Sequence, residues 1–223
     1  ILVHIMSIYA RGGLNDFIVD CGYKSGVIKE YFLGLSARVR DWRVNLKDGR
    51  SEAFGICAPN WTVTIVDTGL HTMTGGRIAR LRDIIGDETF MVTYGDGVSD
   101  VDLDAVLAFH RSHGKLVTMT VVRPPSHFGR IEFEGEQVVD FVEKPHRLDD
   151  WINGGFFVVE PEISNFLQQE GMWERVVLER LARDGELMAY RHEGFWHCMD
   201  SLRDRRLLEA LWQDGRAPWR TWE

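Results

Sequence analysis

The stretch Thr89-Phe90-Met91-Val92-Thr93-Tyr94-Gly95-Asp96-Gly97 decides the fold class of this chain. Residues 89–94 form a nearly continuous apolar run, which is typical of a strand buried on both faces of a parallel sheet. The run ends on two glycines that flank Asp96. Because ligands of open α/β sheets bind beyond the carboxyl ends of the strands, this turn is also the first candidate for a functional site.

Helices and strands alternate on both sides of this run. Strands are predicted at 16–21, 62–68 and 116–122, and amphipathic helices at 25–33, 74–85 and 103–113. Strands that alternate with helices are typical of parallel sheets with crossover helices. The pattern therefore predicts an α/β, Rossmann-like fold with a mainly parallel central sheet.

From Pro124 onward the pattern changes. Residues 130–133 and 138–142 alternate apolar and polar side chains across Gly135, which predicts a β-hairpin. Further strands are predicted at 152–159 and 187–191, and helices at 162–169, 174–183 and 202–212. We expect residues 1–223 to form one domain, with residues 1–123 and 124–223 as its two halves.

Two segments fit this rhythm less simply. The chain opens directly on a helical stripe of Leu2, Ile5, Met6 and Tyr9, without an initiator methionine, so we expect a segment to be missing upstream. Residues 35–61 lack a firm period and carry mixed charges, which is typical of a solvated excursion or an oligomer contact.

Composition excludes several classes of protein. The formal net charge of the 223 residues is −8, which argues against a general nucleic-acid surface because phosphate backbones require a basic face. No apolar run approaches the roughly 20 residues of a membrane-spanning helix, which indicates a soluble protein with no membrane partner. Cys21, Cys57 and Cys198 have no short spacing, and this favours reduced thiols in a cytoplasmic protein over disulfides or zinc.

Two carboxylates are candidate metal ligands. Asp96 follows a buried strand and lies between two glycines, and Asp200 directly precedes the last long helix. Mg²⁺ prefers hard oxygen donors, commonly one or two carboxylates with substrate phosphates and water. Both aspartates could instead be turn or cap residues, although Ser201 with Asp204 resembles a capping box that would leave Asp200 free.

Three other motifs are suited to binding a phosphorylated substrate. Residues 72–77 place the Thr72 and Thr74 hydroxyls, Gly75 and the Arg77 guanidinium at a helix start, which suits phosphate or base-edge contacts. Glu143 and Lys144 end a strand, where an acid could accept from sugar hydroxyls and a base could meet phosphate. Asn153-Gly154-Gly155 allows a close backbone approach to a ligand. A capped helix, a surface ion pair and a β-bulge explain the same residues equally well.

Taken in order, these motifs resemble the sugar-1-phosphate nucleotidylyltransferase family, and among its members the cytidylyltransferases. The matching segments are Asp20-Cys21-Gly22-Tyr23-Lys24, Val66-Asp67-Thr68-Gly69, Met73-Thr74-Gly75-Gly76-Arg77, Thr93-Tyr94-Gly95-Asp96-Gly97, Glu143-Lys144-Pro145, Ile152-Asn153-Gly154-Gly155-Phe156-Phe157, Gly194-Phe195-Trp196 and Ala217-Pro218-Trp219-Arg220-Thr221-Trp222. Several are weak alone, but six or more in register are hard to reach by chance.

The resemblance implies a role for each candidate residue. Asp96 and Asp200 would hold Mg²⁺, and Thr72 and Arg77 would contact the nucleotide. All of these residues except Asp200 lie in the nucleotide-binding half, residues 1–123. The remaining predicted substrate contacts are Thr74, Gly75, Tyr94, Gly95, Glu143, Lys144, Asn153 and Gly154. Among all these residues, the resemblance makes Asp96, Asp200, Arg77 and Lys144 the catalytic set, and it assigns sugar-phosphate binding to residues 124–223.

The implied reaction transfers a cytidylyl group from CTP to α-D-glucose 1-phosphate and releases pyrophosphate. The product, CDP-glucose, would supply deoxysugars of bacterial surface polysaccharide, and the family assembles into homo-oligomers. Thymidylyl or uridylyl transfer is the alternative within the family, although Asp-Gly at 96–97 favours cytidine. A nucleotide-sugar-binding module without catalysis is the alternative outside it. A dinucleotide-dependent oxidoreductase has little support because no G-x-G-x-x-G follows a strand.

The chain departs from the family pattern at its start. The family begins with a glycine-rich loop that contains Gly-Thr-Arg and is followed by a lysine, and these elements hold the triphosphate. Since this chain begins inside the family's first helix, we expect the loop to lie upstream and the chain alone not to catalyse.

Overall fold

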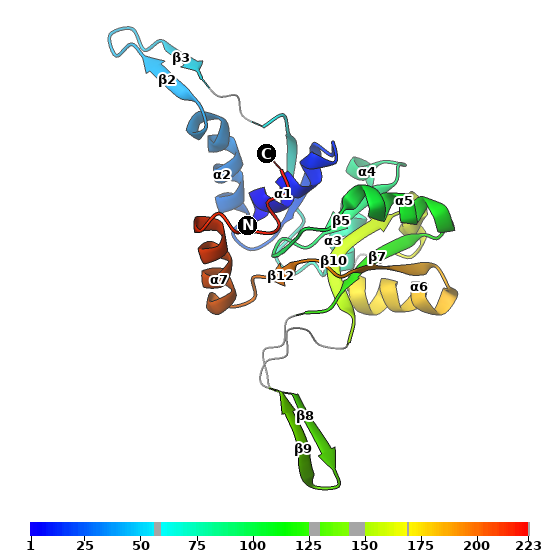
Figure 1. Cartoon of the computed structure of the whole chain (residues 1–223). Coiled ribbons are helices and arrows are strands. Elements are labelled where there is room, and N and C mark those ends of the chain that lie inside the picture. Colours follow the sequence, from blue (N-terminus) through cyan, green and yellow to red (C-terminus); the bar gives the residue numbers. More distant parts are fainter. Residues whose placement is uncertain (56–58, 125–129, 143–149, 169, 223) are drawn as a thin grey trace. The chain divides into compact units, whose positions relative to one another are not determined.

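The computed structural model describes residues 1–55, 59–124, 130–142, 150–168 and 170–222 (Figure 1). The chain divides into two compact units. The larger unit comprises Ile1–Gly13, Asp87–Phe166 and Leu178–Glu223, and the smaller unit comprises Leu14–Gly86 and Leu167–Val177. The functional division at residue 123 stays a prediction.

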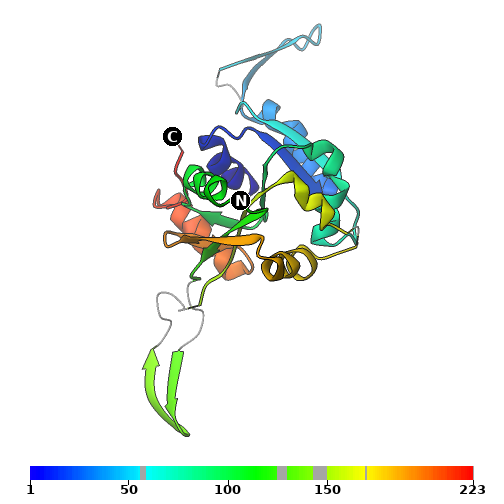
Figure 2. The same cartoon turned by 90° about the vertical axis from the view of Figure 1, so that its right-hand side faces the viewer.

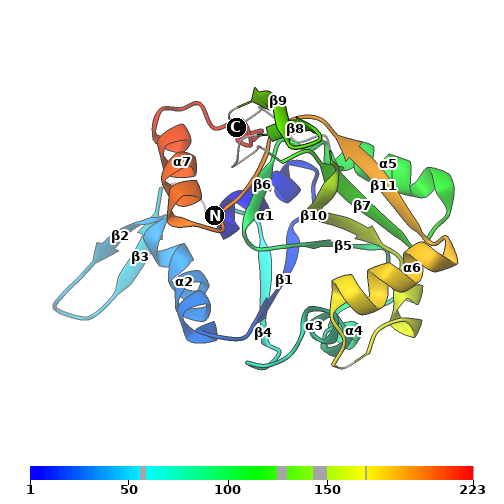
Figure 3. The same ribbon diagram turned by 90° about the horizontal axis from the view of Figure 1, so that it is seen from below.

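A four-stranded sheet forms the centre of the larger unit (Figures 1 and 3). Its order is β11 (Leu187–His192), β7 (Val117–Val122), β10 (Ile152–Val159) and β5 (Phe90–Thr93). β11 runs parallel to β7, whereas β10 runs antiparallel to both β7 and β5. Five of the six residues of β7 are buried, as expected of a β-branched central strand. The sheet is therefore mixed.

Helices cover this sheet through apolar faces. α5 (Leu103–His113) contacts β7, β10 and β11, and α6 (Glu179–Asp184) contacts β11. The Asp102 side chain caps the start of α5 by accepting two backbone N–H groups, and Gly114 ends it with a φ of +63°. α1 (Leu2–Arg11) contacts β6 (Gly97–Ser99) and buries Ile5, Met6 and Tyr9 of the helical stripe expected from the sequence, whereas Leu2 is only half-buried.

The chain's last residues cover the core of the larger unit. Trp219 is 1% exposed, its indole N–H donates to Nδ1 of His4 at 3.0 Å, and its ring stacks on Phe195. Trp212 keeps 38% of its surface exposed. Trp219 is therefore a core residue of the chain itself.

A parallel strand pair forms the core of the smaller unit (Figure 3). β1 (Asp16–Cys21) pairs with β4 (Thr62–Asp67) in register, and α2 (Ser25–Arg38) contacts β4. α3 (Thr74–Arg80) and α4 (Arg82–Ile85) follow β4. The α/β fold class is confirmed by this pair, by the parallel pair β11–β7 and by the helices that separate the strands.

Each unit carries a two-stranded hairpin, drawn as a pair of arrows in Figure 2. β8 (Arg130–Glu134) and β9 (Gln137–Val142) form the predicted hairpin, and Gly135 in its turn has a φ of +60°. β2 (Asp41–Val44) and β3 (Ser51–Phe54) form a second hairpin within the segment that lacks a period. Most residues of β2 and β3 are exposed. Because neither face of this hairpin is buried, its sequence does not need to alternate apolar and polar residues.

Three helix predictions were wrong in detail. The segment predicted as a helix at 162–169 forms only a 3₁₀ turn, η1 (Pro161–Asn165), in which Ile163 is the one buried residue. The helix predicted at 174–183 divides into a π-helical turn, η2 (Trp173–Leu178), and α6. The helix predicted from Thr74 to 85 divides at Leu81. Short apolar stripes do not fix the continuity of a helix, because its hydrogen bonding also depends on tertiary contacts.

In the part of the chain that the structure describes, no helix combines the length and the apolar character needed to cross a bilayer.

The antiparallel pairing of β6 with β12 (Trp196–Cys198) leads directly into the last helix, α7 (Leu202–Gln213). α7 starts at a capping box, in which the Asp204 carboxylate accepts the Ser201 backbone N–H at 2.8 Å and the Ser201 hydroxyl at 2.6 Å. His197 lies 3.2 Å from the other Asp204 oxygen. The Ser201 hydrogen bonds lower the pKa of Asp204, and His197 lowers it further.

Asp204→Asn should therefore destabilise the protein at pH 7, by about 1.5–3 kcal/mol for a lost hydrogen bond to a charged group. Because the folded pKa is depressed, this contribution is present above the unfolded value of about 3.9 and is lost as the pH falls through the folded value. The difference between wild type and variant in urea unfolding should shrink below about pH 4. Asp214→Asn, at the exposed end of α7, should change stability by less than about 0.5 kcal/mol at any pH; a constant difference for Asp204→Asn would contradict this account.

Candidate active site

Asp96 and Asp200 come together because their strands pair. In the larger unit, Cys198 of β12 lies opposite Gly97 of β6, and the Met199 N–H donates to the Asp96 carbonyl at 2.9 Å. This pairing places both carboxylates at the same end of the two strands, and both residues are exposed. Partial desolvation of its carboxyl by the surrounding atoms raises the pKa of Asp96, and repulsion from the charge of Asp200 raises this pKa further.

The mutual repulsion of these two carboxylates is what a bound cation would relieve. Among the residues that the structure describes, no group of three or more His, Cys, Asp or Glu side chains could hold a metal ion. A pair of carboxylates nevertheless fits Mg²⁺, which commonly takes one or two protein carboxylates and completes its octahedron with phosphate and water oxygens. The donors present therefore fit Mg²⁺ better than a zinc site.

The capping box leaves Asp200 available, as the sequence suggested. Asp204 and Ser201 satisfy the start of α7, so Asp200 is not needed as its cap. The Cys198 thiol lies 3.2 Å from Oδ2 of Asp200. Burial and the neighbouring carboxylates raise the pKa of Cys198 to about 12, so this group is a neutral thiol that donates to Asp200.

A pocket of about 260 Å³ adjoins the carboxylates within the larger unit. Asn153 organises one wall, because its Oδ1 accepts the Gly155 N–H at 2.8 Å and its Nδ2 donates to the Tyr94 hydroxyl at 3.1 Å. The lining residues are Thr93, Tyr94, Asp96, Gly97, Ile152, Asn153, Gly154, Gly155, Phe156, Trp196, Cys198 and Asp200. The structure thus brings together Tyr94, Asp96, Asn153, Gly154 and Asp200, with Gly95 between two of them in the chain.

A β-bulge shapes the same wall. The register of β10 against β7 shifts between Asn153 and Phe157, and Gly155 within the shift has a φ of +77°. A Cβ on Gly155 would lie 2.7 Å from the Tyr94 ring, so glycine is required for both conformation and space. The Trp196 indole N–H donates to the Gly154 carbonyl at 2.8 Å. The bulge and a binding wall, two alternatives at the sequence level, are therefore compatible.

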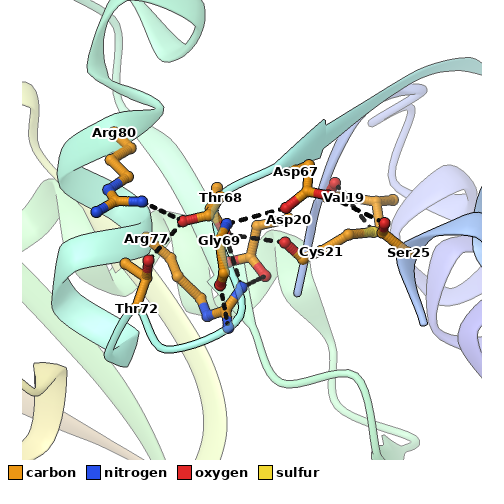
Figure 4. Close-up of polar contacts among 10 residues, drawn as sticks. All are labelled: Val19, Asp20, Cys21, Ser25, Asp67, Thr68, Gly69, Thr72, Arg77 and Arg80. Carbon is orange, nitrogen blue, oxygen red and sulfur yellow. Dashed lines mark hydrogen bonds and ion pairs between the residues drawn. The ribbon is translucent and has the colours of Figure 1, made fainter. Parts of the chain in front are cut away.

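The smaller unit holds a second polar cluster, around the turn between β4 and α3 (Figure 4). The Thr72 hydroxyl donates to the Thr68 carbonyl at 2.5 Å, and Arg77 donates through Nη1 to the Thr68 hydroxyl at 2.6 Å and through Nη2 to the Gly69 carbonyl at 3.2 Å. Arg77 also lies 4.0 Å from Asp20. Burial raises the pKa of Asp20, and the charge of Arg77 opposes that rise.

Thr74 and Gly75 contact another part of the smaller unit. The Thr74 hydroxyl donates to Glu174 at 2.9 Å and accepts the Trp173 N–H at 2.9 Å. Gly75 is buried, and a Cβ there would lie 2.7 Å from the Gly171 carbonyl oxygen. Close packing against Gly171 therefore accounts for a glycine at position 75. Substrate binding by Thr74 and Gly75 stays a prediction.

Sequence reasoning assigned no role to three residues that organise these clusters: Thr68, Trp196 and Cys198. Trp196 and Thr68 lie within segments that match the family pattern, which was the available signal. Cys198 gave no signal, because its contact with Asp200 depends on the turn that follows β12. The predicted residues Glu143 and Lys144 lie outside the described residues, and so does Cys57.

Comparisons with known proteins identify the family of the chain. The profile of the family described as Nucleotidyl transferase matches residues 52–210. The chain is 46% identical to glucose-1-phosphate cytidylyltransferase of Salmonella typhi over 225 residues, which cover 100% of this chain and 88% of the relative. It is 38% identical to the probable glucose-1-phosphate cytidylyltransferase of Bacillus subtilis, over 100% of this chain and 87% of that protein.

Two solved structures share the fold at low sequence identity. HddC from Yersinia pseudotuberculosis superposes with a TM-score of 0.63 at 17% identity, over 92% of this chain and 82% of that one. The inositol-1-phosphate CTP transferase from T. maritima superposes with a TM-score of 0.60 at 13% identity, over 100% of this chain and 84% of that one. From the profile match and the identities above, the chain belongs to the nucleotidyl transferase family and, within it, to the glucose-1-phosphate cytidylyltransferases.

Proposed function

We propose that this protein transfers a cytidylyl group from CTP to α-D-glucose 1-phosphate, giving CDP-glucose and pyrophosphate, with Mg²⁺ as cofactor. Membership of the cytidylyltransferase family makes the chain a nucleotidyltransferase. The observation that carries the metal-dependent mechanism is the pairing of β6 with β12, which sets Asp96 and Asp200 beside each other. No protein nucleophile is needed, because a phosphate oxygen of the sugar phosphate attacks the α-phosphorus directly.

The chain's own residues position and neutralise the reactants in this proposal. Asp96 and Asp200 would hold Mg²⁺, which would supply positive charge against the phosphates. Tyr94, Asn153 and Gly154 form the wall that receives glucose 1-phosphate, supported by the contact of Asn153 with Tyr94. In-line displacement gains most from groups already fixed before the reaction. Asn153 and Tyr94 are joined by a hydrogen bond, and the Gly154 carbonyl accepts one from Trp196.

The nucleotide contacts are proposed for the smaller unit. Arg77 and Thr72 would contact CTP, with Thr74 and Gly75 beside them at the start of α3. Glu143 and Lys144 would bind the sugar phosphate, as the family resemblance implies. The proposal extends to a cytoplasmic homo-oligomer that supplies deoxysugar synthesis. The exposed side chains Trp42, Val44, Leu46 and Phe54 on the β2–β3 hairpin support a subunit contact, and the free thiols Cys21 and Cys198 suit a reducing compartment.

Pyrophosphate release tests the reaction and the metal role together. The natural full-length protein, assayed with Mg²⁺ and glucose 1-phosphate, should release pyrophosphate with CTP and far less with UTP or dTTP. Asp96→Asn should lower kcat by about 100-fold or more, since a preorganised charge interaction in the transition state is lost. Asp104→Asn, an exposed carboxylate on α5, should have wild-type activity.

A preference for UTP or dTTP would keep the mechanism and overturn the assignment of the base. No release with any nucleotide from folded protein would favour a nucleotide-sugar-binding module without catalysis.

Gly155→Ala tests the wall beside Tyr94. The new methyl group would meet the Tyr94 ring and force a left-handed backbone on alanine, so the KM for glucose 1-phosphate should rise about 10-fold, as expected when a substrate-positioning side chain moves. Gly114→Ala is the matched control, because Gly114 has a φ of +63° but no atom within 4 Å of the added Cβ. Both variants should lose about 1–3 kcal/mol of stability. Equal KM values for the two variants would count against a substrate-binding wall.

A further inference from the structure

We propose that Thr68 is a positioning residue for nucleotide binding: its hydroxyl and carbonyl fix Arg77 and Thr72 in the arrangement that receives CTP. This inference rests on the proposed function, which assigns the nucleotide to Arg77 and Thr72. Thr68 itself is 2% exposed and does not need to touch the substrate.

Thr68 is anchored to the strand pair of the smaller unit. It follows the last residue of β4, and its backbone N–H donates to the Cys21 carbonyl at 2.9 Å. Its hydroxyl donates to the same carbonyl at 3.2 Å. Cys21 is the last residue of β1, so the backbone bond continues the pairing of β1 with β4 to Thr68, and the hydroxyl bond adds a second contact with the same carbonyl. Thr68 is therefore a fixed point rather than part of an adaptable loop.

Three side chains from the following turn and helix converge on this fixed point (Figure 4). Arg77 donates to the Thr68 hydroxyl, which accepts with its lone pair while its hydrogen points to Cys21. Thr72 and Arg80 both donate to the Thr68 carbonyl, each at 2.5 Å. Arg77 and Arg80 reach Thr68 together because residues three apart lie on the same face of a helix.

The neighbouring groups restrict the Arg77 guanidinium to one position. Its side chain is 18% exposed, and the Gly69 carbonyl and Asp20 hold the guanidinium from two further directions. Gly22 makes room, because a Cβ there would lie 2.6 Å from Nη2 of Arg77. A guanidinium carries five N–H donors, and the hydrogen bonds to Thr68 and Gly69 use two. Further donors thus have fixed directions that a phosphate or base edge can meet.

Removing the Thr68 hydroxyl should leave the Arg77 side chain in place but less firmly positioned. Arg77 would lose its shortest hydrogen bond, and its donor would face an apolar methyl group in a buried setting. The guanidinium would then shift toward Asp20 or Gly69. Because a displacement of about 1 Å in a positioning group can cost up to about 100-fold, even a small shift should weaken CTP binding.

The test compares four single variants and one double variant of the full-length protein for KM with CTP and with glucose 1-phosphate. Thr68→Val, which keeps the shape and loses the hydroxyl, should raise the KM for CTP about 10-fold and leave the KM for glucose 1-phosphate within about twofold. Thr68→Ser keeps the hydroxyl and should restore the KM for CTP. Thr120→Val is the matched control, since Thr120 is fully buried in β7 and its hydroxyl has no hydrogen-bond partner among the described residues.

The fourth variant, Arg77→Ala, tests whether Thr68 acts through Arg77. In the Arg77→Ala background, adding Thr68→Val should raise the KM for CTP by less than about twofold, because the group that it positions is already gone. A full 10-fold loss in that background, an unchanged KM in Thr68→Val, or a Thr68→Ser variant as poor as Thr68→Val would overturn the inference.

Failure of the proposed function would look different. Wild-type protein that releases no pyrophosphate with CTP would remove the basis for both proposals, whereas active wild type with an unaffected Thr68→Val would remove only this one. Thermal unfolding of each variant checks folding. If Thr68→Val does not fold, Thr68→Ala gives the same comparison without a second γ-methyl group to accommodate beside Arg77.

Discussion

The antiparallel pairing of β6 with β12 is the constraint on which the candidate active site depends. Residues 96 and 200 lie more than a hundred positions apart in the chain, and only this register places their carboxylates at one strand end. Partial desolvation raises the pKa of Asp96, and the repulsion from Asp200 that the structure must tolerate raises it further. Proteins rarely keep two like charges together without a counter-charge, so the cost of this arrangement is itself an argument for a cation.

Both candidate clusters use the same physical device, namely side chains fixed by other side chains or by strand ends. In the larger unit, Asn153 holds the Tyr94 hydroxyl and the Gly155 backbone, and Cys198 donates to Asp200. In the smaller unit, Thr68 accepts hydrogen bonds from the side chains of Thr72 and Arg77. Preorganised groups need little rearrangement in the transition state, which suits a reaction whose catalyst acts by positioning and charge.

The sequence predicted the features that local pattern controls. The strand 152–159 and the helix 103–113 have the predicted bounds, because both have strong periodicity and clear end signals. It also paired Asp96 with Asp200, but through family resemblance rather than geometry. The β2–β3 hairpin was missed because its faces are not sorted by burial, and Thr68 was missed because its role is set by three neighbours that converge only in the fold.

The central claim is that Asp96 and Asp200 hold one divalent cation. Electron paramagnetic resonance of Mn²⁺, titrated into the full-length protein with CDP-glucose present, measures this directly, because a bound nucleotide sugar can complete the coordination by its phosphates. The account predicts one bound ion per chain in the wild type, and binding weakened by at least about 10-fold in Asp96→Asn and in Asp200→Asn, the usual scale for losing a charged ligand interaction. Wild-type affinity in both variants would contradict it.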